Sequence, residues 1–308
     1  MIEDSENLGS AGSGRDPADS GVVVRRASLA DLWGLAWLRT LAGWNQDVPF
    51  WRLLLTFPGV EVWVLARGKE IRAVSSIWTY GSELAWIGMV IVHPAYRRRG
   101  FGKRLLQLCL RRCERLGVAT VGLDATPAGE GLYKSLGFVS GEAISRMILP
   151  ADAGPRAERD YGETLHSGRA SKHFEEEWRS LDVGAFGVDR LGLIEAVASG
   201  AINCERHLDR VGRWDGFGML RRGARHRYLG PLVASCPEVG RDLVLRLLQH
   251  SAGRSVVWDV PQKNLSATSL SRELGFEFSR KLTRMWLPRE LPRKHPEWAW
   301  ALVDPALG

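Results

Sequence analysis

The sequence predicts an α/β protein that contains two copies of one unit. Strand-like and helix-like segments alternate in the first half, a polar stretch follows, and short motifs then recur in the same order. The chain has 308 residues, which is long enough for two domains of ordinary size. We expect a flexible leader at 1–20, a first domain at 21–150, a linker at 151–166, a second domain at 167–290 and a tail at 291–308.

The composition indicates a soluble globular protein. Hydrophobic residues make up 45% and charged residues 25% of the chain, both ordinary values. The net charge of +7 is mild for this length and is weak evidence for nucleic-acid binding. No stretch reaches the roughly 20 apolar residues that cross a bilayer, and the first residues lack a signal-peptide pattern. We therefore expect a cytoplasmic protein.

The cysteines do not indicate a metal site. No histidine lies at ligand spacing from Cys109 or Cys113, and these two residues are one helical turn apart, where disulfide geometry is poor. We expect these two, with Cys204 and Cys236, to be small apolar packing residues in a reducing compartment. No metal is expected.

The first copy begins with a strand at 22–26 and a helix whose apolar side contains Leu32, Leu35, Ala36 and Leu38. A segment rich in Trp and Pro surrounds a second short helix. Residues 61–92 then form three strands, with turns at 67–69 and 81–82.

A longer helix is predicted at 100–116, with Gly117 as its C-cap. A strand at 120–123, a short helix that ends in LYKSLGF and a last strand at 143–149 complete the unit.

The second half repeats motifs of the first. GMVIV from Gly88 is matched by GPLVA from Gly230, and LLQ recurs at the same spacing. SLGF and SRMILP are matched by ELGF and LTRMWLP at a slightly smaller spacing. The ungapped spacing places Val239, Asp242 and Val244 where the first copy has Arg97, Gly100 and Gly102.

The stretch VHPAYRRRGFGKRLL, residues 92–106, predicts an anion site. It follows an apolar strand, contains a glycine turn and opens a helix, whose first N–H groups have no internal partners. The helix dipole adds about half a positive charge there. The stretch matches neither a Walker loop nor a dinucleotide fingerprint. Binding of single-stranded nucleic acid would need interleaved aromatic residues, for which Tyr96 and Phe101 are the candidates.

The spacing V-x-P-x-x-R-x-x-G-x-G, here Val92, Pro94, Arg97, Gly100 and Gly102, resembles the acetyl-CoA signature of the GNAT superfamily of N-acetyltransferases. L-Y-x-x-x-G-F at 132–138 stands where the family has its closing motif. LDATPAG and GWNQ resemble a bacterial branch with a second, degenerate acetyltransferase-like lobe. The resemblance covers roughly residues 22 to 290. It implies tandem lobes, each a mostly antiparallel central sheet flanked by helices, and acetyl-CoA (coenzyme A) as co-substrate.

The resemblance also implies the donor site. The strand before the loop lies beside the pantetheine arm, and the loop holds the pyrophosphate. By motif position the donor contacts are Met89, Val90, Ile91, Val92, Arg97, Arg98, Arg99, Gly100, Phe101, Gly102 and Lys103.

The reaction needs a neutral amine, a stabilised oxyanion and a proton for the leaving thiolate. An alkyl ammonium with pKa near 10.4 is only about 0.04% neutral at pH 7. Tyr133 matches the family position of the proton donor; a tyrosine that packs in the core is the alternative. Asp124 is a candidate base, and a water chain is its competitor. The family often has Asn where this chain has Thr126, which weakens detailed inferences about that turn.

Acceptor contacts are expected from Trp44, Asn45 and Gln46, which lie between the first two helices; a capping turn packed on the core would also explain them. In the second lobe Asp189 could pair with a cationic acceptor or cap the following helix. Ser271 replaces Tyr133 there, whereas Asn264 keeps the asparagine of the family. The second lobe is expected to lack a coenzyme A site and to cover the cleft or add acceptor contacts.

We therefore expect an acyl-CoA-dependent N-acyltransferase that moves acetyl to a primary amine of a small molecule or peptide by direct attack. The alternatives are a non-catalytic acyl-CoA sensor and a nucleic-acid-binding module that uses the patch at 97–99. Neither membranes nor nucleic acids are expected partners. The sequence leaves open which amine is acylated, the length of the acyl chain and the oligomeric state.

Overall fold

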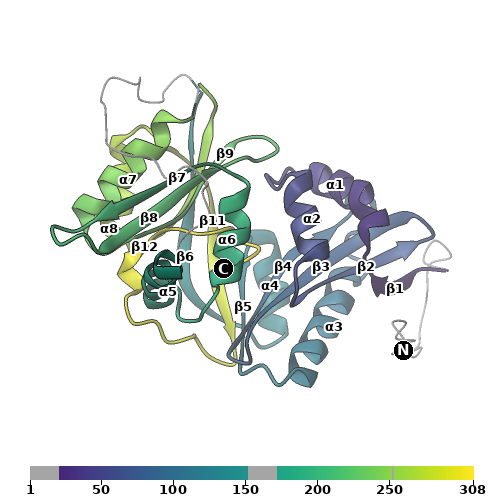
Figure 1. Ribbon diagram of the computed structural model, residues 1–308. Helices are drawn as coiled ribbons and strands as arrows, with labels where there is room; N and C mark the ends of the chain where they lie inside the picture. Colours follow the sequence, from purple (N-terminus) through teal and green to yellow (C-terminus); the bar gives the residue numbers. More distant parts are fainter. Residues whose placement is uncertain (1–20, 152–171, 252) are drawn as a thin grey trace. The chain divides into compact units, whose positions relative to one another are not determined.

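The fold is taken from a computed structural model, shown in Figure 1, which describes residues 21–151, 172–251 and 253–308. The predicted leader at 1–20 and most of the predicted linker at 151–166 lie outside these residues. The chain divides into two compact units, Met1–Val118 and Ala119–Gly308, called here the first and second unit. The boundary falls inside the predicted first domain, because the elements after residue 118 pack with the second half of the chain.

The first unit is an antiparallel sheet with helices. Its strands pair in the order β1-β2-β3-β4. Its elements are β1 (Val23–Arg26), η2 (Leu29–Asp31), α1 (Leu32–Leu41), α2 (Val48–Thr56), β2 (Val60–Arg67), β3 (Glu70–Tyr80), β4 (Leu84–Val92), η3 (Pro94–Tyr96) and α3 (Phe101–Arg115).

The predicted strands and helices of this unit are present. β3 and β4 are buried along almost their whole length, as expected for strands covered on both faces. α1 buries the four apolar residues that its pattern predicted. α3 buries both of its cysteines, and loss of water raises the pKa of each thiol to about 12. All four cysteines of the chain are free thiols.

The second unit contains a sheet in the order β5-β11-β6-β10-β9-β8-β7, and β12 pairs with β9. Its elements are β5 (Thr120–Ala125), α4 (Pro127–Ser135), β6 (Val139–Leu149), α5 (Lys172–Phe186), α6 (Leu191–Ser199), β7 (Ala201–Leu208), β8 (Trp214–Arg221), β9 (Arg227–Ala234), α7 (Pro237–Gln249), β10 (Val256–Pro261), α8 (Leu265–Glu273), β11 (Glu277–Leu287), η4 (Pro296–Trp298) and β12 (Ala299–Ala301).

The two copies exchange their last strands within this unit. The series β5-α4-β6 of the first copy recurs as β10-α8-β11 in the second. However, β11 pairs with β5 on one edge and with β6 on the other, and β6 pairs in turn with β10 (Figure 1). Each copy therefore completes its neighbour's part of the sheet instead of its own.

The second unit has its core around α7, α8, β9 and β10, with Trp258, Leu243 and Leu247 fully buried. The segment predicted as a tail, 291–308, belongs to this core. Trp300, Val303 and Leu307 of that segment are all buried.

The sequence repeats predicted that the two copies align without a gap, and this prediction is wrong in the loop that follows β4 and β9. β4 and α3 are connected by residues 93–100, whereas only Ser235 and Cys236 connect β9 to α7. Asp242 and Val244 therefore lie inside α7 and are not in a loop. Asp242 forms an ion pair with Arg246 at 2.9 Å, one helical turn away. Val239 is also helical and buried.

Candidate active site

The loop between β4 and α3 is shaped to receive an anion. Gly100 is the N-cap of α3 and has φ of +79°, a conformation that L side chains rarely adopt. No side chain caps this helix, and its first turn contains no acidic residue. The first backbone N–H groups of this 15-residue helix therefore have no side-chain cap and face the loop.

The loop presents several cations at the surface. Residues 97–100 are exposed, and Arg97 donates from Nε to the carbonyl of Val92 at 3.3 Å. Among the residues that the structure describes, Arg98 and Lys103 form no ion pair. An anion at the helix N-terminus would therefore meet positive charge that no carboxylate already neutralises.

A polar cluster on β3 holds the start of this loop. The hydroxyl of Tyr96 donates to Oε1 of Glu70 at 2.7 Å, and Arg72 pairs with the same carboxylate at 3.0 Å. The Arg72 guanidinium also lies 4.2 Å from the centre of the Tyr96 ring. The Tyr96 hydrogen bond, followed by that of Arg72, lowers the pKa of Glu70. Sequence reasoning missed Glu70 and Arg72, because nothing in the pattern connects β3 with a residue 26 positions later.

β4 contains a bulge where the donor's backbone contacts were predicted. Val74 pairs with Ile91 and Ser76 with Gly88, so the ladder is irregular at Met89 and Val90. Met89 has φ of +49°, rare for a residue with a side chain, and is buried. Such a bulge takes backbone groups out of the ladder at that point. Ile91 and Val92 return to regular pairing.

The predicted acceptor residues lie in the turn between α1 and α2. Asn45 and Gln46 are buried, and Trp44 is half-buried. The cap of α2 is the next residue, Asp47, whose side chain accepts from the Phe50 N–H at 2.9 Å. The capping role is thus taken by Asp47, and acceptor contact by the three preceding residues stays a prediction.

Tyr133, the predicted proton donor, lies on α4 in the second unit and is 8% exposed. Its ring meets Phe138 edge-on, with 6.1 Å between the centres. A Cβ added to Gly129, one turn earlier, would come within 2.9 Å of the Tyr133 ring. The Tyr133 ring therefore occupies space that a side chain at position 129 would need.

Asp124, the candidate base, is held in a buried ion pair. Both of its oxygens accept from Arg284 of β11, at 2.9 and 3.0 Å, and its side chain is 0% exposed. Burial raises the pKa of Asp124, and Arg284 opposes that shift. A carboxylate with both oxygens engaged is poorly placed to take a proton from an amine. Sequence reasoning missed Arg284, because only the strand exchange brings it to β5.

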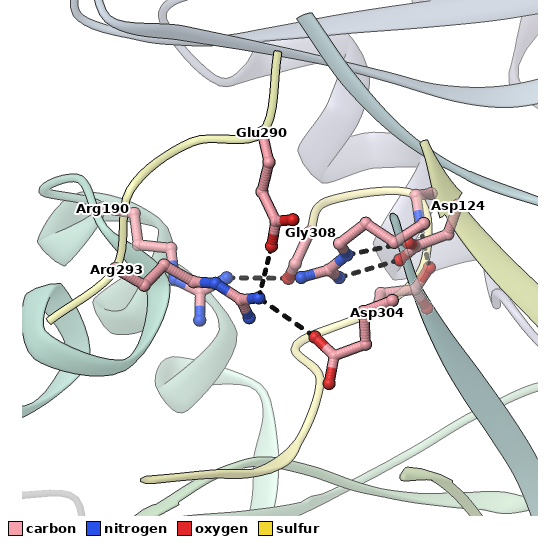
Figure 2. A network of polar contacts seen from close by, with 9 residues as sticks. Asp124, Arg190, Glu290, Arg293, Asp304 and Gly308 are labelled. Atoms are coloured by element: carbon pink, nitrogen blue, oxygen red, sulfur yellow. Dashed lines mark hydrogen bonds and ion pairs between the residues drawn. The ribbon is translucent and has the colours of Figure 1, made fainter. Parts of the chain in front are cut away.

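Other polar contacts belong to the same network as Asp124, as Figure 2 shows. Arg293 pairs with Glu290 at 2.9 Å, and Arg190 donates to the Gly308 carbonyl at 2.7 Å. Arg293 also pairs with Glu142 at 3.1 Å. Arg190 also pairs with Asp182. These contacts hold several segments of the second unit together.

Asp189, the second-lobe candidate, has local partners. It pairs with Arg179 at 2.7 Å, and its Oδ1 accepts from the backbone N–H of Leu191 at the start of α6. The helix-start role is therefore present, and contact with an acceptor stays a prediction.

Metal chemistry has no candidate site in the described ranges, where no group of three or more His, Cys, Asp or Glu residues could hold an ion. Likewise, none of the helices described is long and apolar enough to cross a membrane.

The fold and the loop define an α/β protein with two copies of one unit, of which one has a glycine turn before a helix without a side-chain cap. Models of the acetyltransferase (GNAT) domain match residues 58–140 and residues 178–298. An uncharacterized N-acetyltransferase of Bacillus subtilis, YitH, is 25% identical over 242 residues, 78% of this chain and 82% of that protein. A holothin acyltransferase of a Pseudoalteromonas species is 28% identical over 223 residues, 70% of each chain.

Solved structures share the fold. A putative acetyltransferase from Pyrococcus horikoshii superposes with a TM-score of 0.77 at 24% identity, covering 97% of this chain and all of that one. A tandem GNAT protein from the clavulanic acid biosynthesis pathway gives 0.65 at 17% identity, with 87% and 100% coverage.

The chain belongs to the GNAT superfamily and has two GNAT domains. It is an N-acetyltransferase, as the sequence motifs predicted. The predicted α/β class with tandem GNAT-like lobes is confirmed as well.

Proposed function

We propose that the protein uses acetyl-CoA as donor and moves the acetyl group to a primary amine of a small molecule or peptide by direct attack. The observation that carries this proposal is the N-terminus of α3, which has no side-chain cap, follows a glycine at positive φ and is flanked by Arg98 and Lys103, neither of which forms an ion pair within the described part of the chain. Such a site suits the pyrophosphate of coenzyme A.

The proposed donor contacts divide between backbone and side chains. The bulge at Met89 and Val90 would offer backbone groups to the pantetheine arm and to the thioester carbonyl. The Arg97–Lys103 stretch would hold the phosphates. Tyr133, which matches the position of the proton donor in the GNAT motif, would give its proton to the leaving thiolate.

The proposed acceptor is a primary amine, because the family transfers its acyl group to nitrogen. The amine must lose a proton before it attacks, since its ammonium form has no lone pair. One relative is by name an acyltransferase of holothin, which supports a small-molecule acceptor. The segment 44–46 is proposed to contact the acceptor, with Asp189 as a second candidate.

The test is a single substitution in the loop with a matched control. Gly100→Asp places a carboxylate at the helix N-terminus in a strained backbone, and we expect acetyl-CoA affinity to fall about 100-fold or more. Gly81→Asp is the control, because Gly81 also has positive φ and open space but lies in the turn between β3 and β4. Calorimetry gives both affinities. Equal affinities in the two folded variants would place the phosphates elsewhere and refute the proposed donor site.

A further inference from the structure

In the second copy, β9 and β10 diverge, and another segment of the chain fills the opening. The two strands pair in parallel only between residues 227–229 and 256–258. Beyond that point β9 continues to Ala234, and its new partner is β12, with Ala299 opposite Val233 and Ala301 opposite Leu232. Residues 297–302, which contain β12, are called here the inserted segment.

The inserted segment is also bound on the side away from β9. Asn264, the N-cap of α8, donates from Nδ2 to the carbonyls of Glu297 at 2.9 Å and Ala299 at 3.1 Å. The backbone N–H of Leu302 donates to the carbonyl of Asp259 on β10 at 3.3 Å. The backbone of the segment therefore has partners on both walls of the opening.

The side chain of Trp300 fixes the segment to the helix behind it. Trp300 is 3% exposed, and its backbone carbonyl accepts a hydrogen bond from Nε1 of Trp258 at 2.8 Å. The indole packs on Gly240 of α7 so closely that a Cβ at Gly240 would overlap the ring. Glycine is a poor helix former, so its presence within α7 is explained by the room that Trp300 takes.

The helix end that corresponds to the anion site is closed too. α7 begins with Pro237, which has no backbone N–H, and its first turn contains Glu238. The pKa of Glu238 is lowered by a hydrogen bond from its own backbone N–H and then by Cys236. The first turn of α7 therefore already carries a negative charge, which would repel an external anion.

The elements β9, α7 and β10 repeat β4, α3 and β5 in order along the chain. We infer that the inserted segment occupies, in the second copy, the cleft that receives the pantetheine arm in the first, so that the chain has one donor site. This inference rests on the proposed function, which places the pantetheine arm beside β4. A strand is a fitting substitute, because pantetheine also offers amide groups for backbone pairing.

Hydrogen exchange of the full chain, followed by mass spectrometry with and without saturating coenzyme A, tests the inference. We expect residues 300–302, the buried part of the inserted segment, to exchange as slowly as β9 in both states. Fast exchange in the free protein, or acceleration on addition of coenzyme A, would overturn it, and so would calorimetry that gives two sites per chain. The loop at 93–103 is the separate readout of the proposed function: if coenzyme A leaves its exchange unchanged, the proposed donor site fails, whatever the inserted segment does.

A substitution at Gly240 tests the anchor. Gly240→Ala should speed exchange of residues 297–302 at least 10-fold and lower the melting temperature, because the new methyl group displaces Trp300. Gly131→Ala on α4 is the matched control, since a Cβ there meets nothing within 4 Å. In the Trp300→Ala background the Gly240→Ala effect should largely disappear. Unchanged exchange in folded Gly240→Ala would show that Trp300 does not hold the segment.

Discussion

The ring of Tyr133 occupies space beside Gly129, and substitutions at these two residues test whether Tyr133 is the proton donor. Tyr133→Phe should lower turnover about 100-fold and leave acetyl-CoA affinity within a few-fold, as expected for the loss of a general acid. Gly129→Ala keeps the hydroxyl but moves the ring, because the new methyl would lie 2.9 Å from it. Steady-state kinetics and calorimetry measure both variants. Normal turnover of Tyr133→Phe with a good amine would make the tyrosine a packing residue.

The Tyr96–Glu70 hydrogen bond gives a second prediction at the scale of the residue. Tyr96→Phe removes the bond that ties the loop to β3, and we expect acetyl-CoA to bind about 3- to 10-fold more weakly at unchanged saturating turnover. Glu70→Gln should weaken binding at least as much, because it also removes the carboxylate that pairs with Arg72. Adding Tyr96→Phe to Glu70→Gln should weaken binding little further, because the bond between the two side chains is already weakened. Additive losses would show that the two side chains act separately.

At the scale of the element, each exchanged strand carries a buried arginine to the other copy. Arg146 of β6 pairs with Asp259 of β10 at 2.6 Å, and Arg284 of β11 pairs with Asp124 of β5 at 2.9 Å. Both arginines occupy the same position in matching motifs, SRM and TRM. The two pairs are therefore one interaction present twice.

Removing one partner of such a pair leaves a buried charge uncompensated. Asp124→Asn should lower the free energy of unfolding by about 3–5 kcal/mol, and Asp259→Asn should behave alike. The double variant Asp124→Asn/Arg284→Gln should recover much of that stability, measured by denaturant titration. It should recover turnover as well if Asp124 is structural. Recovered stability without turnover would instead support Asp124 as the base.

Local pattern predicted the strand–loop–helix around Gly100, because every residue that defines it lies within residues 92–103. The strand exchange could not be predicted, since β6 and β11 end in matching motifs, SRMIL and TRMWL, and either could pair with β5. The shortened second loop was missed for a related reason. Leucines on a helix recur every three or four residues, so LLQ can match in more than one register.

At the scale of the whole molecule, the exchanged strands predict that the two halves do not fold alone. A chain broken within 152–171 separates β6 from β10 and β11, its two partners. We expect each half expressed by itself to be insoluble or non-cooperative in melting. Co-expressed halves should form a stable one-to-one complex, measured by size-exclusion chromatography with light scattering. A cooperative, monomeric isolated half would contradict the observed pairing.

The exchange of β6 and β11 has the topology of a domain-swapped dimer joined into one polypeptide. Joining the partners replaces a bimolecular association by an intramolecular one, at the effective concentration that the connecting chain sets. Assembly of the swapped sheet then no longer depends on how much protein the cell makes. Because the two copies are parts of one polypeptide, they do not need to have the same sequence. One copy can keep the long glycine loop before α3 while the other has a two-residue loop before α7 and β12 beside β9, an asymmetry that two identical subunits encoded by one gene could not achieve.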